Sequence, residues 1–297
     1  MTDAPAPILV TSANGNQGKC LVPRLLAAGH RVRACVQSSA SAEALRKQGV
    51  QELLVGDLAE PAFIHKAMRG VSSVYHIGPT LHPAERAMGF NIIDAAREEG
   101  VGHFVFSSVL HAITTDLVQH EIKRDIEEHL LSSGLEFTIL QPANYMLAAR
   151  LKPVFEEGVF RLSWALERYQ SMVDLDDVAE VASMVLSQPE RHLAATYELV
   201  GPGRFTAHEI GQVLSGVINT EIRVERIDMA AFVRARFGEG DPVTFAHQAQ
   251  VSQSIETRYS NHDFLGNSNV LSWLLGREAT HFEDFVRKEY AAYQAQK

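Results

Sequence analysis

Two titratable side chains, His120 and Lys123, stand three residues apart in a segment with helical periodicity. Positions i and i+3 share one face of a helix, so the imidazole and the ammonium group would point the same way. A histidine can donate a proton near neutral pH, and a lysine can hold a polar or anionic group electrostatically. Two other interpretations stay open. Lys123 could pair with Glu127 at i and i+4 on a solvated face, and His120 could be a surface or capping residue.

A second stretch that could do chemistry is residues 8–18, where a short apolar run enters a turn that contains Gly15 and Gly18. An amphipathic segment follows, so the order is strand, tight turn and helix. Such a helix N-terminus directs free N–H groups at a phosphate. Gly15 would let a pyrophosphate approach the backbone, and Gly18 would let the helix pack closely on its strand. Ser12 replaces the first glycine of the usual pattern, and a glycine turn without a ligand is the alternative.

The segments that would position these residues alternate between strand and helix six times. We expect strands over residues 8–11, 31–36, 51–55, 73–77, 103–107 and 136–140, and helices over 17–28, 42–48, 62–68, 83–99 and 120–131. In the last helix Ile122, Ile126 and Leu130 form an apolar stripe. Alternation with short connections predicts an α/β fold, a doubly wound parallel sheet with helices on both faces.

Ligands of such sheets bind beyond the carboxyl ends of the strands. This rule places six loops at the rim of one site. They are residues 12–18, 37–39, 57–58, 78–79, 107–108 and 141–145.

After Met146 the alternation ends. Strands are expected over 159–162, 197–200 and 223–227, and helices over 176–186, 205–217, with Thr206 as N-cap, and 280–293; residues 237–260 have no clear assignment. We interpret residues 1–150 as a nucleotide-binding domain and 151–297 as a smaller α+β substrate domain from which the chain can cross back to the sheet. The large apolar side chains that follow the sixth strand are either pocket walls or plain core; they are Met146, Phe160, Trp164 and Phe205.

Composition excludes several classes of protein. The chain of 297 residues has a net charge of −9 and no lysine-rich block, which disfavours nonspecific binding to nucleic acid or to an anionic membrane. The N-terminus does not look like a signal peptide, and no apolar run is long enough to span a bilayer. Cys20 and Cys35 are expected to be small buried residues of a reduced, cytoplasmic protein. No metal site is expected, because His76, His82 and His111 lack cysteine or spaced acidic partners.

Several stretches together resemble the NmrA-like proteins, a branch of the atypical short-chain dehydrogenase/reductase superfamily. They are residues 11–18, 103–108, 120–123, 133–142, 197–202, 264–266, 274–276 and 282–286, so the similarity spans nearly the whole chain. The resemblance implies a Rossmann-type NAD(P)-binding domain and a small carboxy-terminal domain. Some members of the family are NADPH-dependent reductases of quinones and other aromatic or conjugated compounds. Others are redox sensors that bind dinucleotide without turnover.

The resemblance also implies which residues bind the cofactor. They are Thr11, Ser12, Asn14, Gly15, Asn16, Gln17, Gly18, Gln37, Ser38, Asp57, Leu58, Gly78, Pro79, Ser107, Lys123, Pro142, Ala143 and Tyr145. Asp57 and Leu58 would lie against the adenine, although Asp57 could instead cap its own loop. Pro142 and Tyr145 would border the nicotinamide and the substrate.

The end of the second strand bears on the choice of dinucleotide. A carboxylate there would bind both ribose hydroxyls and select NAD, but this chain has the neutral residues Gln37, Ser38 and Ser39. NADP-binding relatives tend to carry an arginine where this chain has Gln37. The neutral side chains could serve either cofactor, and we favour NADP(H) over NAD(H).

Short-chain reductases usually combine a tyrosine, a lysine four residues later and a serine on the fifth strand. Four residues before Lys123 this chain has Gln119, which has no titratable proton, so it departs from the family pattern at the tyrosine. The resemblance implies catalytic roles for Lys123 and Ser108, and the i, i+3 spacing adds His120 as a proton donor, so the expected catalytic set is Lys123, His120 and Ser108. We expect an NAD(P)H-dependent oxidoreductase that transfers hydride to a small conjugated, aromatic or quinone-like substrate. The alternative is a non-catalytic dinucleotide sensor that acts through a protein partner.

Overall fold

The structure, a computed structural model, describes residues 5–238 and 240–296. Within this part the chain forms two compact units. The first contains residues up to 113, 120–141 and 178–197, and the second contains residues 114–119, 142–177 and those from 198 onward. The chain therefore leaves and re-enters each unit more than once.

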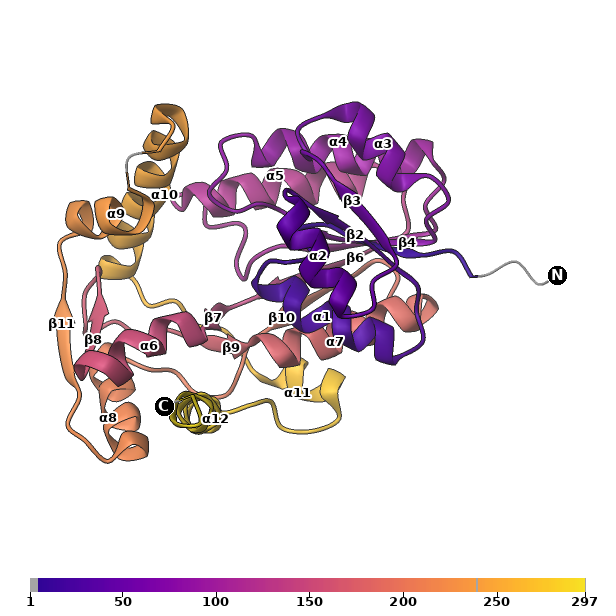
Figure 1. Ribbon diagram of the computed structural model, residues 1–297. Coiled ribbons are helices and arrows are strands. Elements are labelled where there is room, and N and C mark those ends of the chain that lie inside the picture. Colours follow the sequence, from indigo (N-terminus) through magenta and orange to yellow (C-terminus); the bar gives the residue numbers. More distant parts are fainter. Residues whose placement is uncertain (1–4, 239, 297) are drawn as a thin grey trace. The chain divides into compact units, whose positions relative to one another are not determined.

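Over the described residues, a seven-stranded sheet with the order β10-β6-β5-β4-β1-β2-β3 forms the centre of the first unit (Figure 1). Its strands are β1 (Ile8–Val10), β2 (Val32–Val36), β3 (Glu52–Val55), β4 (Ser73–Ile77), β5 (His103–Ser107), β6 (Phe137–Pro142) and β10 (Ala195–Leu199). Each neighbouring pair from β3 to β6 is parallel. The expected Rossmann-type parallel sheet is confirmed, and its order reverses between β1 and β4.

The strand β10 is a member of the sheet that the alternation pattern does not predict there. It lies next to β6, and the Ala194 N–H donates to the Phe137 carbonyl at 2.8 Å. The helix before it, α7 (Leu175–Ser187), is one more helix of the alternating series. The pattern is hidden because residues 143–174 are inserted between β6 and α7.

Helices connect the strands on both faces of the sheet. They are α1 (Asn16–Ala27), α2 (Ser39–Lys47), α3 (Pro61–Met68), α4 (Glu85–Glu98) and α5 (Val118–Ser132), together with α7. The expected stripe of α5 is confirmed, because Ile122, Ile126 and Leu130 are all buried. Gly89 lets α4 approach this stripe, since a Cβ there would lie 2.5 Å from Ile126 Cδ1.

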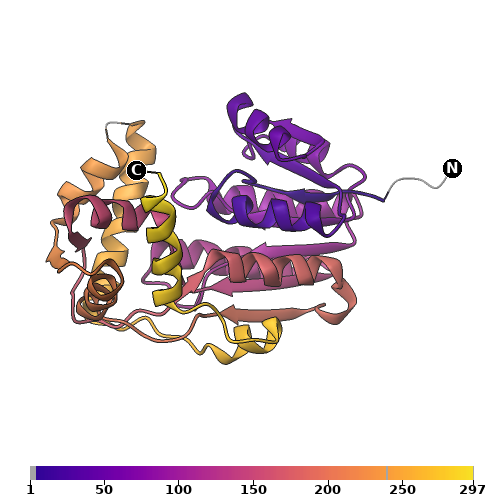
Figure 2. The same cartoon turned by 60° about the horizontal axis from the view of Figure 1, so that its bottom comes forward.

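The second unit has two short strand pairs and six helices in its described residues. The pairs are β7 (Asn144–Met146) with β9 (Met172–Asp174), and β8 (Val159–Leu162) with β11 (Arg223–Arg226). The helices are α6 (Ala148–Glu157), α8 (Ala207–Ile218), α9 (Met229–Phe237), α10 (Pro242–Asn261), α11 (Asn269–Leu275) and α12 (Phe282–Gln294). The helix α12, yellow in Figure 2, packs against α6 and α8.

Capping explains two of these helices. Thr206 is the N-cap of α8 and forms a capping box with Glu209, as its position predicts. The segment without a clear assignment folds largely as α10, whose N-cap Asp241 accepts from the Thr244 N–H. Its apolar periodicity is weak because the helix buries few residues, among them Val251 and Tyr259. No helix in residues 5–238 and 240–296 combines the length and apolar character that crossing a bilayer requires.

Replacing Gly18 by alanine should destabilise the protein. A Cβ at this position would overlap the carbonyl oxygen of Ala13, which is backbone and cannot rotate away. We expect a loss of about 1–3 kcal/mol in the free energy of unfolding, measured in urea.

The matched control is Gly216→Ala, because Gly216 is an exposed residue of α8 where a Cβ would meet nothing within 4 Å. This variant should be stabilised by roughly 0.4–1 kcal/mol. Similar effects of the two substitutions would contradict the packing role of Gly18.

Candidate active site

The turn between β1 and α1 is shaped for an anion. Gly15 is the N-cap of α1 and has no side chain to cap the first-turn N–H groups, and this turn contains no acidic residue. A Cβ on Gly15 would lie 3.0 Å from the Ser12 carbonyl oxygen, so backbone occupies the inner side of the turn. Asn16, the first residue of the helix, is exposed. A pyrophosphate fits these features, since helix N-termini and their dipoles favour negative charge.

Ser12 shows why a glycine is usual at the start of this turn. Its φ is +47°, in the left-handed region that L-residues rarely adopt. The Ser12 hydroxyl donates to the Ile77 carbonyl at 3.0 Å, and the Ile77 N–H donates to Thr11 Oγ1 at 2.8 Å. These bonds tie the end of β1 to the end of β4, so the structure brings Thr11 and Ser12 close to Gly78 and Pro79.

Gln17 and Ser107 meet in a buried polar cluster. Gln17 Nε2 donates to Ser107 Oγ at 2.8 Å, and the Tyr75 hydroxyl donates to Gln17 Oε1 at 2.8 Å. All three residues are buried. These side chains therefore fasten α1 to the ends of β4 and β5.

Lys123 and Glu85 form a buried ion pair at the carboxyl ends of β4 and β5. Lys123 Nζ lies 2.8 Å from Glu85 Oε1, and the two side chains are 3% and 0% exposed. The ammonium group also donates to the Ser107 carbonyl at 3.4 Å and lies 5.1 Å from the centre of the Phe106 ring. A Cβ on Gly78 would lie 2.5 Å from Glu85 Oε1 and 2.8 Å from Lys123 Nζ, so glycine makes room for the pair.

This geometry decides between the interpretations of Lys123 and His120. Lys123 is buried and pairs with Glu85, so an ion pair with Glu127 on a solvated face is wrong. His120 is 3% exposed, so it is not a surface residue. Its Nδ1 lies 3.0 Å from the His111 carbonyl oxygen. Because a carbonyl only accepts, that nitrogen carries a proton.

Ser108 contacts a carboxyl group that lies on α5. Its hydroxyl donates to Glu127 Oε1 in a short hydrogen bond, and Gln141 Nε2 donates to the same oxygen at 2.8 Å. Burial raises the pKa of Glu127 above its ordinary value, against the opposing effects of Ser108, Gln141 and the Lys123 cation. Ser108 therefore has a buried carboxyl group as its hydrogen-bond partner, and the pKa of that group is shifted upward.

The residues expected near the adenosine lie at the ends of β2 and β3. Gln37 and Ser38 are exposed, and Ser38 Oγ accepts from the Ser41 N–H as the N-cap of α2. Asn14 Nδ2 donates to Ser41 Oγ at 2.7 Å, which brings Asn14 and Ser38 to one polar cluster. Asp57 Oδ1 accepts from the Ala59 N–H at 2.9 Å, so this carboxylate caps its own loop, and the neighbouring Leu58 is buried.

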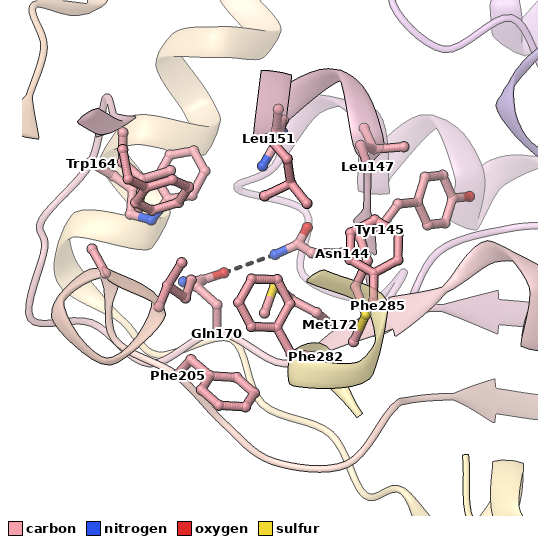
Figure 3. A pocket seen from close by; sticks show the side chains of 16 residues that line it. Asn144, Tyr145, Leu147, Leu151, Trp164, Gln170, Met172, Phe205, Phe282 and Phe285 are labelled. Carbon is pink, nitrogen blue, oxygen red and sulfur yellow. Dashed lines mark hydrogen bonds between the residues drawn. The ribbon is translucent and has the colours of Figure 1, made fainter. Parts of the chain in front are cut away.

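The remaining expected residues belong to the second unit. The Ala143 N–H, next to Pro142, donates to the Leu199 carbonyl at 2.9 Å, and Tyr145 is paired with Val173 in β7 and β9. Tyr145 also lines an apolar pocket (Figure 3). The four residues expected as either pocket walls or plain core all line this pocket, and three of them are also part of the buried core; the four are Met146, Phe160, Trp164 and Phe205, of which the first three are buried.

The histidines considered for a metal have other surroundings. His76 is buried between Phe104 and Phe106, with Nδ1 3.0 Å from Thr11 Oγ1. Burial, aided by the Lys123 cation, lowers the pKa of His76 to about 3. His82 Nδ1 accepts from the Ala84 N–H. The described part of the chain holds no group of three His, Cys, Asp or Glu side chains that could bind a metal ion.

Two carboxylates of the site are missed by motif reasoning. Glu85 follows β4 by eight positions, and nothing in its spacing connects it with Lys123. Glu127 shows the i, i+4 spacing to Lys123, but its contacts are with Ser108 and Gln141. Both could be found by searching the amphipathic helices for acidic residues on the face that is expected to pack against the sheet.

Substituting one partner of the ion pair should be costly. Lys123→Met would leave the Glu85 carboxylate buried without its cation, and we expect a loss of about 3–5 kcal/mol in the free energy of unfolding. Urea denaturation measures this loss.

The double variant Lys123→Met/Glu85→Gln should recover most of that stability, because no uncompensated charge is then buried. If Lys123→Met were as stable as the parent chain, the ion pair would not have the energetic role that its burial indicates.

Comparisons with known proteins agree with this geometry. The model of the NmrA-like family matches residues 5–291. An NAD(P)H azoreductase from Xenophilus azovorans is 30% identical over 294 residues, which cover 97% of this chain and 99% of the relative. Quinone oxidoreductase 2 from Escherichia coli (strain K12) is 26% identical over 285 residues, 94% of this chain and 97% of the relative.

A solved structure of comparable similarity is the triphenylmethane reductase of Citrobacter sp. complexed with NADP(H). It has a TM-score of 0.80 and 25% identity, and the match covers 95% of this chain and 99% of that chain. The fold, the turn at Ser12–Gly18 and these full-length matches lead to one conclusion: the chain belongs to the NmrA-like family.

Proposed function

We propose that this chain is an NADPH-dependent reductase that transfers hydride to a small conjugated, aromatic or quinone-like molecule. The observation that carries the proposal is the full-length similarity to an NAD(P)H azoreductase, which covers 97% of this chain and 99% of the relative. The quinone oxidoreductase and the triphenylmethane reductase support the same class of acceptor.

The first unit has residues that suit a pyridine dinucleotide. The turn at Gly15 would hold the pyrophosphate, and the exposed Gln37 and Ser38 would face the adenosine ribose. We favour NADPH because no carboxylate stands at the end of β2 to repel a 2′-phosphate. When bound, the nicotinamide supplies the hydride.

Lys123 is the residue that we assign to the nicotinamide ribose. Its ammonium group lies beside Gly78 and the Ser107 carbonyl, two positions of the predicted rim. Glu85 holds it there by a buried ion pair, so the ribose hydroxyls would meet a cation in a fixed position. Fixed placement of the reacting ring accounts for much of the rate in such reactions.

Reduction of a carbonyl-type acceptor also consumes a proton, and Ser108 with Glu127 can supply it. The Ser108 hydroxyl donates to Glu127 in the free protein; with substrate bound it would turn to the substrate oxygen, give up its proton there and take one from Glu127 when that carboxyl group is protonated. The raised pKa of Glu127 keeps a proton on this group to higher pH than is usual for a carboxyl. His120, buried on the same helix as Lys123, is the second candidate donor.

Purified protein should oxidise NADPH faster than NADH in the presence of quinones, azo compounds or triphenylmethane dyes, followed at the nicotinamide absorbance. The double variant Lys123→Met/Glu85→Gln should bind NADPH at least about tenfold more weakly, since a charged hydrogen-bond donor is lost. Tight NADPH binding by the parent chain without oxidation by any acceptor would sink the reductase proposal and favour a dinucleotide sensor.

The proposed proton path makes the rate depend on pH. The parent kcat should fall as pH rises through the raised pKa of Glu127, because the group then loses its proton. Glu127→Gln cannot donate, so it should be slower at low pH and lose this dependence.

Glu128→Gln is the matched control, because Glu128 is an exposed neighbour on α5. Its pH profile should coincide with that of the parent chain. Superimposable profiles of Glu127→Gln and the parent would show that Glu127 takes no part in proton transfer.

A further inference from the structure

The second unit contains an apolar pocket built from side chains of β7, α6, β8, β9, α8 and α12 (Figure 3). Its largest wall residues are Phe160, Trp164, Met172, Phe205, Phe282 and Phe285. Aromatic walls of this kind suit a planar ring, which can pack face to edge against them.

One buried amide places a hydrogen-bond donor in this apolar lining. Gln170 is 4% exposed, and its Oε1 accepts from Asn144 Nδ2 at 2.8 Å. The Tyr259 hydroxyl donates to Asn144 Oδ1 at 3.3 Å, which fixes the orientation of both amides. Gln170 Nε2 is therefore the group left over, and it has no hydrogen-bond partner among residues 5–238 and 240–296.

A second donor lines the same pocket. Trp164 Nε1 is buried and likewise lacks a hydrogen-bond partner within the described part of the chain. The Trp164 ring stands edge-on to Tyr259 at 5.3 Å, which holds the indole in place. Buried donors without acceptors cost free energy, so a ligand that supplies an acceptor atom is favoured here.

The described lining residues include a positive charge and no negative charge. No described residue that lines the pocket is acidic, and Arg150 is one of the lining residues. Arg150 is exposed by its surface area, burial of its guanidinium and the nearby Arg236 cation lower its pKa below the ordinary arginine value, and no carboxylate among the described residues pairs with it. An anionic acceptor therefore fits this pocket better than a neutral acceptor, and a cationic group does not fit.

We propose that this pocket binds an aromatic acid, with the ring between the aromatic side chains and the carboxylate facing the donors Gln170 Nε2 and Trp164 Nε1 and the Arg150 cation. The cavity has a volume of about 40 Å³, enough for a few water molecules. An aromatic ring needs more room than this, so binding would require Met146 and Met172, which are unbranched and flexible, to change rotamer. The proposal goes beyond the proposed function, because it concerns binding in the absence of dinucleotide.

Calorimetric titration of the full chain without dinucleotide tests the proposal with three probes of one shape. They are 2-naphthoate, 2-acetylnaphthalene and 2-ethylnaphthalene, which carry an anionic acceptor, a neutral acceptor and no acceptor. We expect affinity to fall in that order. Equal affinities, or no binding of any probe, would overturn the proposal and leave a cavity that holds water only.

Two variants assign the binding to this pocket. Trp164→Phe removes the indole donor, and Gln170→Glu removes the amide donor while it keeps an oxygen for Asn144. Each should weaken 2-naphthoate binding at least about tenfold more than it weakens 2-ethylnaphthalene binding, because the hydrocarbon contacts the walls but uses neither donor. Trp273→Phe is the matched control, because Trp273 is 75% exposed, and it should bind all three probes as the parent does.

An equal loss of affinity for every probe in Trp164→Phe and Gln170→Glu would indicate damage to the fold and overturn the assignment of the donors. NADPH oxidation by the parent chain is measured separately. Its failure would leave the binding result standing, and a failure of naphthoate binding would leave the reductase proposal standing.

Discussion

A buried cation needs a buried anion, and this constraint organises the site of the first unit. Lys123 comes from α5 and Glu85 from the first turn of α4, and both side chains are almost completely buried where β4 and β5 end. Neither charge would tolerate burial alone, so the pair joins two helices and two strand ends at one point. This arrangement requires a glycine at position 78, because any side chain there would collide with the ion pair.

The surrounding hydrogen bonds fix the positions of the neighbouring strand ends relative to the Lys123–Glu85 ion pair. Thr11 and Ser12 bind the main chain of Ile77, Gln17 binds Ser107, and Ser108 binds Glu127. A sequence motif identifies each of these polar side chains by residue type but does not reveal its hydrogen-bond partner. The result is a rim whose backbone positions are fixed before a ligand arrives, which is the preorganisation that hydride transfer needs.

Periodicity predicts most of the fold because each of the first five strands is short, apolar and followed by an amphipathic helix. It does not predict β10 as part of the sheet, since residues 143–174 separate this strand and α7 from β6. It also leaves α10 unassigned, because a helix that buries few residues shows little periodicity. In the site, Gly18 and Lys123 could be found from local spacing. Glu85 could not, because its partner is 38 positions away and only the tertiary fold brings the two together.

We propose that a hydride leaves a nicotinamide held beside Lys123 and reaches an aromatic or quinone-like acceptor. An anaerobic single-turnover reaction tests it most directly, with NADPH that carries deuterium at one or the other of the two C4 positions of the nicotinamide. We expect NADPH to be oxidised, and one of the two labelled forms to react more slowly, because a fixed ring presents one face to the acceptor. No oxidation, or equal rates for both labelled forms, would contradict hydride transfer at this site.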